Sequence, residues 1–182
     1  MKKKIYIGLG IILVATIGFV GYIAFTTRAH SPSKTTEFSY EGLDIKVVYC
    51  QPYKKGRLIF GEEKDGALQP YGKYWRLGAN EATEITFSKD INFAGNPVGA
   101  GTYRMYAVPG AATWQVTLNS ELGKWGAMEA DHALDVLKVD VPAGTAPSET
   151  EQFTINFGSD TTGIKMDFVW DKTLVSVPIT LQ

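Results

Sequence analysis

The stretch IKMDFVW, residues 164–170, is the clearest indication of the fold in this chain. Its apolar residues stand at every second position, and Lys165 and Asp167 fill two of the positions between them. Successive side chains of an extended strand point to opposite faces, so this alternation predicts a strand with one apolar and one polar face.

The same alternation recurs through most of the chain. The other expected strands are LDIKVVY (43–49), RLIF (57–60), TEITFS (83–88), TYRMYAV (102–108), WQVTLN (114–119), DVLKVDV (135–141), FTINF (153–157) and TLVSVPI (173–179). Turn-forming residues separate them, for example at 142–147 and 158–163. Roughly nine short strands spaced by turns predict an all-β fold, an antiparallel β-sandwich that is jelly-roll or Greek-key-like. The one helix candidate within it, residues 129–137, also fits a loop followed by a strand.

An uncharged apolar run, residues 5–25, precedes these strands. About 20 apolar residues rising about 1.5 Å each cross the roughly 30 Å hydrocarbon core of a bilayer, so we expect a transmembrane helix. A cleaved signal peptide is the alternative, although its apolar region is usually about 7–15 residues long. Three lysines precede the run and Arg28 alone follows it, which by the positive-inside rule leaves the N-terminus in the cytoplasm.

The sequence therefore predicts four segments. They are a cytoplasmic stub (1–4), a transmembrane anchor or uncleaved signal (5–25), a polar tether (26–37) and a β-sandwich domain (38–182). The tether is rich in Ser, Thr, Pro and Lys, and the remaining residues show no internal repeat and no second linker. We expect a single-pass membrane protein whose C-terminal domain is extracytoplasmic, either periplasmic or extracellular.

The charge balance argues against nucleic-acid binding. The chain has 18 basic and 19 acidic residues, and four of the basic residues lie in or beside the apolar run. The remainder carries 14 basic and 19 acidic residues, a net charge of about −5. Nucleic-acid binding calls for a basic face. The single cysteine, Cys50, cannot form a disulfide within its own chain, and we interpret it as a small buried side chain rather than a reactive thiol.

Few residues point to hydrolytic or metal chemistry. The sequence has no G-x-S-x-G motif and only two histidines, His30 and His132. His132 lies in an acidic stretch with Glu129, Asp131 and Asp135, which fits a solvated loop better than a zinc site with three or four ligands. We therefore predict no metal site and no cofactor, and assign no catalytic residue.

Two further chemistries have weaker support. Oxygen atoms in 149–151 and 156–163 suit Ca²⁺, but neither segment matches a known calcium loop. Glycoside hydrolysis needs two carboxyl groups about 5–10 Å apart. Glu81 and Glu84 are available, but Glu84 faces outward on its strand.

The stretch YGKYWRLGANEAT, residues 71–83, holds the densest group of candidate site residues. One interpretation is structural: Arg76 or Arg57 pairs with Glu81, and Asn80 helps to fix the loop over the core. The other is a pocket with aromatic walls in which these polar groups hold a ligand. The candidate ligand-binding residues are Arg57, Tyr71, Trp75, Arg76, Asn80, Glu81 and Trp125, with Tyr74 as a further wall.

Three blocks of the sequence resemble a known family. They are KGRLIFGE (55–62), YGKYWRLGANEATEITFSKD (71–90) and AGTYRMYAVPG (100–110). Together with Trp114, Asn119, Trp125, Gly126 and the closing VSVPI (175–179), they are similar to the bacterial domain-of-unknown-function family 2911. The resemblance implies an exported bacterial protein, and it brings no activity, cofactor or substrate to this chain.

We therefore expect a membrane-anchored, extracytoplasmic binding or envelope-associated module with a glycan or protein ligand. The rival hypothesis is an envelope enzyme that uses Arg57, Arg76 and Glu81. A third is an interaction protein that offers an exposed strand edge to a partner.

Overall fold

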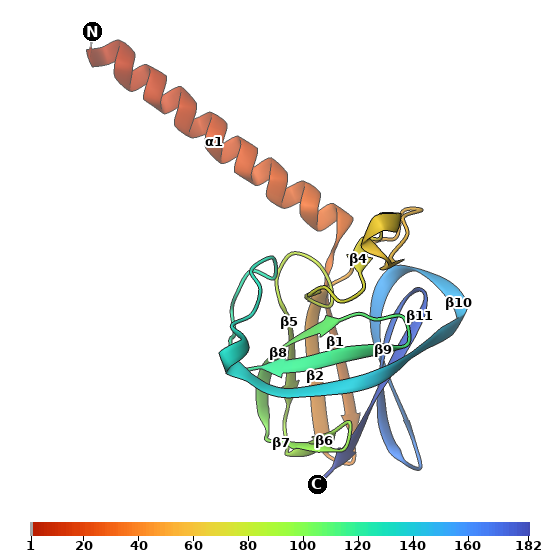
Figure 1. The fold of residues 1–182 in the computed structure, drawn as a ribbon. Coiled ribbons are helices and arrows are strands. Elements are labelled where there is room, and N and C mark those ends of the chain that lie inside the picture. The colour runs from red at the N-terminus through yellow and green to blue at the C-terminus, as the bar shows by residue number, and fades with distance from the viewer. Residues whose placement is uncertain (1) are drawn as a thin grey trace.

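A computed structural model describes residues 2–182 of the chain. It begins with a single long helix, α1 (Lys2–His30), which projects away from the β-domain (Figure 1). Gly8–His30 is the one helix of the described chain that is long and apolar enough to cross a membrane, and none of its apolar window is buried in the structure. A membrane anchor and a signal sequence both have this length and composition.

Eleven strands follow α1. In chain order they are β1 (Ser33–Tyr40), β2 (Leu43–Cys50), β3 (Phe60–Gly61), β4 (Gln69–Pro70), β5 (Thr83–Phe87), β6 (Ile91–Phe93), β7 (Asn96–Val98), β8 (Gly101–Val108), β9 (Thr113–Asn119), β10 (Asp135–Asp160) and β11 (Gly163–Leu181). Two 3₁₀ turns, Glu63–Asp65 and His132–Leu134, lie between strands.

Nine of these strands form one antiparallel sheet that folds over on itself. Its order is β1-β2-β5-β8-β9-β10-β11-β6-β7, and the short β3 and β4 pair with each other in parallel. The beginning of β10 pairs with β9, whereas its later part pairs with β11, so this long strand passes from one layer to the other (Figure 1). The sheet does not close into a barrel. The predicted all-β, antiparallel β-sandwich behind an N-terminal apolar helix is confirmed.

Several segments differ from the sequence-based expectation. Of residues 57–60, expected as a strand, only Phe60 lies in one, the two-residue β3, and the short strands β4, β6 and β7 were not expected. Residues 142–147, expected as a turn, lie inside β10, where register shifts between Thr145 and Thr154 absorb the irregular stretch. Residues 26–37, expected as a tether, contain the last turn of α1 and the first half of β1. Strand β1 pairs with β2 residue for residue from Ser33 onward, because backbone pairing does not require an apolar sequence.

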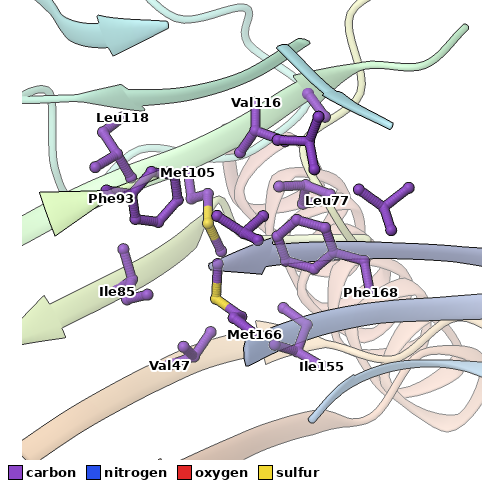
Figure 2. Close-up of a cluster of buried hydrophobic side chains, with 14 of the residues drawn as sticks. Val47, Leu77, Ile85, Phe93, Met105, Val116, Leu118, Ile155, Met166 and Phe168 are labelled. Carbon is purple, nitrogen blue, oxygen red and sulfur yellow. The ribbon is translucent and has the colours of Figure 1, made fainter. Parts of the chain in front are cut away.

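The core fills the space between the two layers. Figure 2 shows Val47, Ile85 and Met105 directed toward Ile155, Met166 and Phe168 of the long strands β10 and β11. Next to this cluster, the rings of Trp75 and Trp170 stack with their centroids 5.8 Å apart, and Trp114 packs edge-on against Trp75 at 5.6 Å. These buried aromatic rings remove a large apolar area from water, which is the main favourable term in folding.

One buried tyrosine also joins the two layers through hydrogen bonds. The Tyr49 hydroxyl, on β2, accepts the backbone N–H of Ile155, on β10, at 2.9 Å, and Gln51 donates its side-chain amide to the same oxygen at 3.2 Å. Tyr49 is buried, so these bonds fix β2 against the second half of β10.

Candidate functional site

A strained turn after residue 75 presents the polar residues of the 71–83 stretch. Leu77 and Asn80 both have left-handed backbone conformations, with φ of 51° and 56°. The turn is held by the Thr83 hydroxyl, which donates to the Leu77 carbonyl at 2.7 Å. A Cβ on Gly78 would lie 2.7 Å from the Cys50 carbonyl oxygen, so only glycine fits there. This turn leaves Arg76 and Asn80 partly exposed.

Arg76 and Asn80 line a pocket of about 450 Å³ between the end of α1 and the sandwich. The walls come from the end of α1 and the residues after it, from the 52–57 loop, from the 68–69 segment and from the 76–80 turn. The lining residues are His30, Ser31, Pro52, Lys55, Arg57, Leu68, Gln69, Arg76, Gly78, Ala79, Asn80 and Trp170. Three of them are permanent cations, and none of the lining residues in the described chain is a carboxylate. The pocket is therefore basic, in a domain that is acidic overall.

Arg76 is the most deeply placed of these cations. It is partly buried, and its one hydrogen bond within residues 2–182 runs from Nη1 to the Asn80 carbonyl at 3.4 Å. It forms no ion pair with any described carboxylate. Burial lowers the pKa of Arg76, Tyr74 opposes that change, and the nearby charge of Arg104 adds to it. Arg76 thus carries the cost of partial desolvation without an acidic partner.

The other two cations, Lys55 and Arg57, are exposed on the 52–57 loop. Arg57 donates Nε to the Lys54 carbonyl at 2.9 Å and Nη2 to the Tyr53 carbonyl, so backbone oxygens position its guanidinium. Neither Arg57 nor Lys55 forms an ion pair with a carboxylate of the described chain, whereas Lys54 pairs with both Glu149 and Asp171 at 2.6 and 2.7 Å.

Glu81 does not pair with Arg76 or Arg57, so the ion pair predicted in the structural interpretation is not formed. Its carboxylate instead pairs with Arg28 at the end of α1 and accepts the Cys50 thiol, with Sγ 3.3 Å from Oε2. The positive-φ turn at Asn80 directs Glu81 toward α1, a direction that sequence spacing does not reveal.

Cys50 is buried, as its position in an alternating strand predicted. Burial, with the hydrogen bond and charge of Glu81, raises the pKa of the Cys50 thiol, so the thiol is protonated at neutral pH.

The predicted candidate residues divide among four places. Arg57, Arg76 and Asn80 meet in the basic pocket. Glu81 and Trp125 lie side by side through an isolated β-bridge and line a neighbouring groove with Val48. Tyr71 lines a third cavity beside Phe60 and Trp114. Trp75 is 2% exposed and belongs to the core, with its indole N–H donated to the Gly78 carbonyl at 3.2 Å.

A buried polar contact that no sequence pattern indicated involves Arg104. Arg104 is fully buried and pairs through Nη1 with Glu121 at 3.0 Å. Its Nη2 donates to the Tyr74 hydroxyl at 2.7 Å and to the Met128 carbonyl, while its Nε has no partner. This residue fixes the 120–131 loop to β8. A polar residue on the outer face of a predicted strand was the only available signal, and it does not distinguish a covered face from a solvated one.

A second polar network holds the end of the same loop. Asp135 accepts hydrogen bonds from the Tyr106 hydroxyl at 2.8 Å, from Asn119 Nδ2 at 2.8 Å and from Lys138 Nζ at 2.9 Å. Burial alone would raise the pKa of Asp135, but these donors outweigh it and lower the pKa below its usual range. His132 Nδ1 lies 2.8 Å from the Tyr106 oxygen. The described residues contain no group of three His, Cys, Asp or Glu arranged to hold a metal ion.

Comparison of the chain with protein-family models gives one match. The model of "Protein of unknown function (DUF2911)" matches residues 31–179, from just after α1 to near the end of β11. The chain belongs to this family. No curated protein and no solved structure gives a significant match. The DUF2911 match reaches every strand of the sandwich and includes most of the lining of the basic pocket, and it leaves out all of α1.

Proposed function

We propose that this DUF2911 protein is a membrane-anchored, extracytoplasmic binding module whose basic pocket takes an anionic group of an envelope ligand. The observation that supports the proposal is the set of Lys55, Arg57 and Arg76 around one pocket without a lining carboxylate in the described part of the chain. Guanidinium groups bind carboxylate and phosphate oxygens through paired, charge-assisted hydrogen bonds.

The partial burial of Arg76 strengthens this proposal. A desolvated guanidinium without an acidic partner is unfavourable in the empty protein, and an anion would compensate it. The fully buried Arg104, by contrast, is compensated internally by Glu121. The uncompensated charge of Arg76 is therefore better explained by a ligand.

The rest of the lining suits an uncharged polar body attached to the anionic group. Asn80, Gln69 and Ser31 provide hydrogen-bonding groups, and Leu68 provides apolar surface. A volume of about 450 Å³ is within the usual range for small-ligand sites. An acidic glycan unit and the acidic end of a protein both have this chemistry, and the binding experiment below separates them.

The rival enzyme hypothesis loses support from the position of Glu81. That hypothesis needs Glu81 beside Arg57 and Arg76 as a general acid or base. Its carboxylate is instead paired with Arg28 and Cys50, outside the lining of the basic pocket.

The membrane orientation of the chain in this proposal follows from α1 and its flanking charges. Lys2, Lys3 and Lys4 before the apolar run favour a cytoplasmic N-terminus, which leaves the sandwich outside. A reporter that is active only outside the cytoplasm, fused after Gln182, should therefore be active. Activity of a cytoplasm-only reporter at the same position would contradict this orientation.

Binding is best tested by titrating the full chain, reconstituted in nanodiscs of neutral lipid, with defined probes. Inorganic phosphate, a uronic-acid oligosaccharide and an acidic peptide would be compared with their neutral counterparts by calorimetry. Arg76→Gln should weaken binding of the preferred anionic probe about tenfold or more, since a lost charge-assisted bond costs about 1.5–3 kcal/mol. Lys46→Ala is the matched control, because Lys46 is an exposed lysine outside the pocket that pairs with Glu37. Equal binding by Arg76→Gln and the wild type would refute the proposed site.

A further inference from the structure

Exposed apolar side chains of the β-domain gather in one stretch. Apart from α1, seven large hydrophobic residues are exposed in the described chain, and five of them lie between residues 122 and 136. They are Leu122, Trp125, Met128, Leu134 and Val136. Three of them stand on the 122–128 loop, with exposed fractions of 42% for Leu122, 47% for Trp125 and 53% for Met128. Clustered apolar exposure of this kind marks an interaction surface.

The 122–128 loop is firmly held, so the exposure of these side chains is a fixed feature. The Gly126 N–H donates to the Asn80 carbonyl at 3.0 Å, and the Met128 N–H donates to the Trp125 carbonyl at 3.0 Å. Buried Arg104 also donates to the Met128 carbonyl. These bonds hold the backbone while the three apolar side chains remain outside.

The loop is joined to the end of α1 by two short links. Arg28 and Ser31 contact Glu81 and Asn80 through an ion pair and a 3.2 Å hydrogen bond. Residues 80–82 in turn pair with residues 124–126. Arg28 follows the last residue of the apolar run by three positions, a rise of about 4.5 Å along the helix. Figure 1 shows the teal loop at the end of the sandwich where α1 joins it.

We propose that the 122–128 loop is a second membrane contact, with Leu122, Trp125 and Met128 resting in the interfacial region of the bilayer that α1 spans. The proposal rests on the membrane anchoring proposed for α1 above. Tryptophan favours the interface because its ring is apolar and its N–H is polar. A lipid surface fits this loop better than a protein partner because the loop is tied to the point where the chain leaves the membrane.

The charges around the loop define the lipid that it should prefer. Lys124 is compensated by Glu121 at 3.5 Å, and Glu129 and Asp131 lie exposed just beyond the loop. These carboxylates disfavour an anionic surface, so the contact depends on apolar burial and not on attraction to anionic lipids.

The distribution of tryptophans allows a direct test. The sequence has four, none of them in α1. All four are described; Trp75, Trp114 and Trp170 are at most 2% exposed, whereas Trp125 is 47% exposed. The full chain would be reconstituted in nanodiscs of ordinary lipid and of lipid brominated close to the headgroup. Brominated lipid should quench part of the tryptophan emission, and Trp125→Phe should remove that quenching. The double variant Leu122→Ser, Met128→Ser, which leaves Trp125 in place, should reduce the quenching at least twofold.

Accessibility to aqueous iodide gives the complementary readout. In nanodiscs of neutral lipid, Trp125 should be shielded from iodide, and added anionic lipid should not increase the quenching by brominated lipid. If iodide quenches the Trp125 emission and brominated lipid does not, the proposed loop contact is overturned, and the proposed anchoring by α1 is unaffected. Failure of the chain to enter nanodiscs at all would instead overturn the anchoring on which both proposals rest.

Discussion

Arg104 and Arg76 both lie close to Tyr74, yet they have opposite surroundings. Arg104 is fully buried and is matched by Glu121, the Tyr74 hydroxyl and a backbone carbonyl. Arg76 is only partly buried and has one long bond, to the Asn80 carbonyl. The first arginine holds a loop in place, and the second lines a pocket whose described walls contain no carboxylate.

This difference gives a rule for the effect of a charged residue on stability. A buried cation that the chain itself compensates contributes to the folded state, and removing it leaves its partners unpaired. A partly desolvated cation without an internal partner adds little to stability and remains available for a ligand. Four predictions test the rule, in order of decreasing effect on stability.

Arg104→Ala should cause the largest loss of stability. The change leaves Glu121 and Tyr74 without their partner and opens a cavity beneath the 120–131 loop, so we expect a loss of about 3–5 kcal/mol. Chemical denaturation followed by tryptophan fluorescence measures it. Lys46→Ala, which breaks an exposed pair, is the control with an expected change below about 1 kcal/mol. A similar small change in Arg104→Ala would remove the distinction between the two arginines.

Asp135→Asn should cause the next largest loss of stability, and the size of this loss should depend on pH. Its carboxylate is 7% exposed and accepts three hydrogen bonds, so the change should cost about 1–3 kcal/mol near pH 7. Because the folded-state pKa of Asp135 is lowered, its contribution is complete above the usual aspartate value of about 4 and is lost as the pH falls through the folded value. The difference between wild type and variant should therefore shrink below about pH 4. Asp140→Asn, at an exposed position on the same strand, should show no such pattern.

Glu81→Gln should have a small effect on stability. Its pair with Arg28 is surface exposed, with side-chain exposures of 41% and 51%, so we expect a loss of about 0–1 kcal/mol. The pKa of the Cys50 thiol should fall, since Glu81 helps to raise it, but burial should keep it above the usual range. The pH dependence of thiol alkylation measures that change. An unchanged alkylation profile would show that Glu81 does not act on Cys50.

Arg76→Gln should leave stability unchanged or slightly higher. Removing a partly desolvated charge that lacks an acidic partner relieves a cost and breaks only one long hydrogen bond. Denaturation of Arg76→Gln and Arg104→Ala under the same conditions completes the comparison. A loss above about 2 kcal/mol in Arg76→Gln would make Arg76 a structural residue like Arg104.

Much of the fold could be predicted from the sequence because strand alternation is a local property. The runs at 43–49, 83–88 and 114–119 became β2, β5 and β9 with their apolar positions buried. Strand lengths were less predictable: residues 135–141 and 153–157 belong to one strand, since bulges let β10 continue through a segment rich in proline and glycine. Strand β1 forms because it pairs with β2, and the polar sequence of β1 gave little indication of a strand.

The candidate site was predicted only in part. Sequence patterns brought out Arg57, Arg76 and Asn80, which line one pocket, but they also included Trp75, which is buried, and Tyr71, which lines a different cavity. They did not indicate Arg104, because alternation separates the two faces of a strand without showing whether a distant loop covers the outer one.

The sequence by itself determined the class of fold, the apolar N-terminal helix and the family, because hydrophobic periodicity and family motifs are written in consecutive residues. The tertiary structure decided which charges are compensated: it gave Glu81 to Arg28 and Cys50, Glu121 to Arg104, and no carboxylate of the described chain to Arg76. Electrostatic partners are set by proximity in space, and the turn at residues 77–80 and the 120–131 loop create that proximity only after the chain has folded.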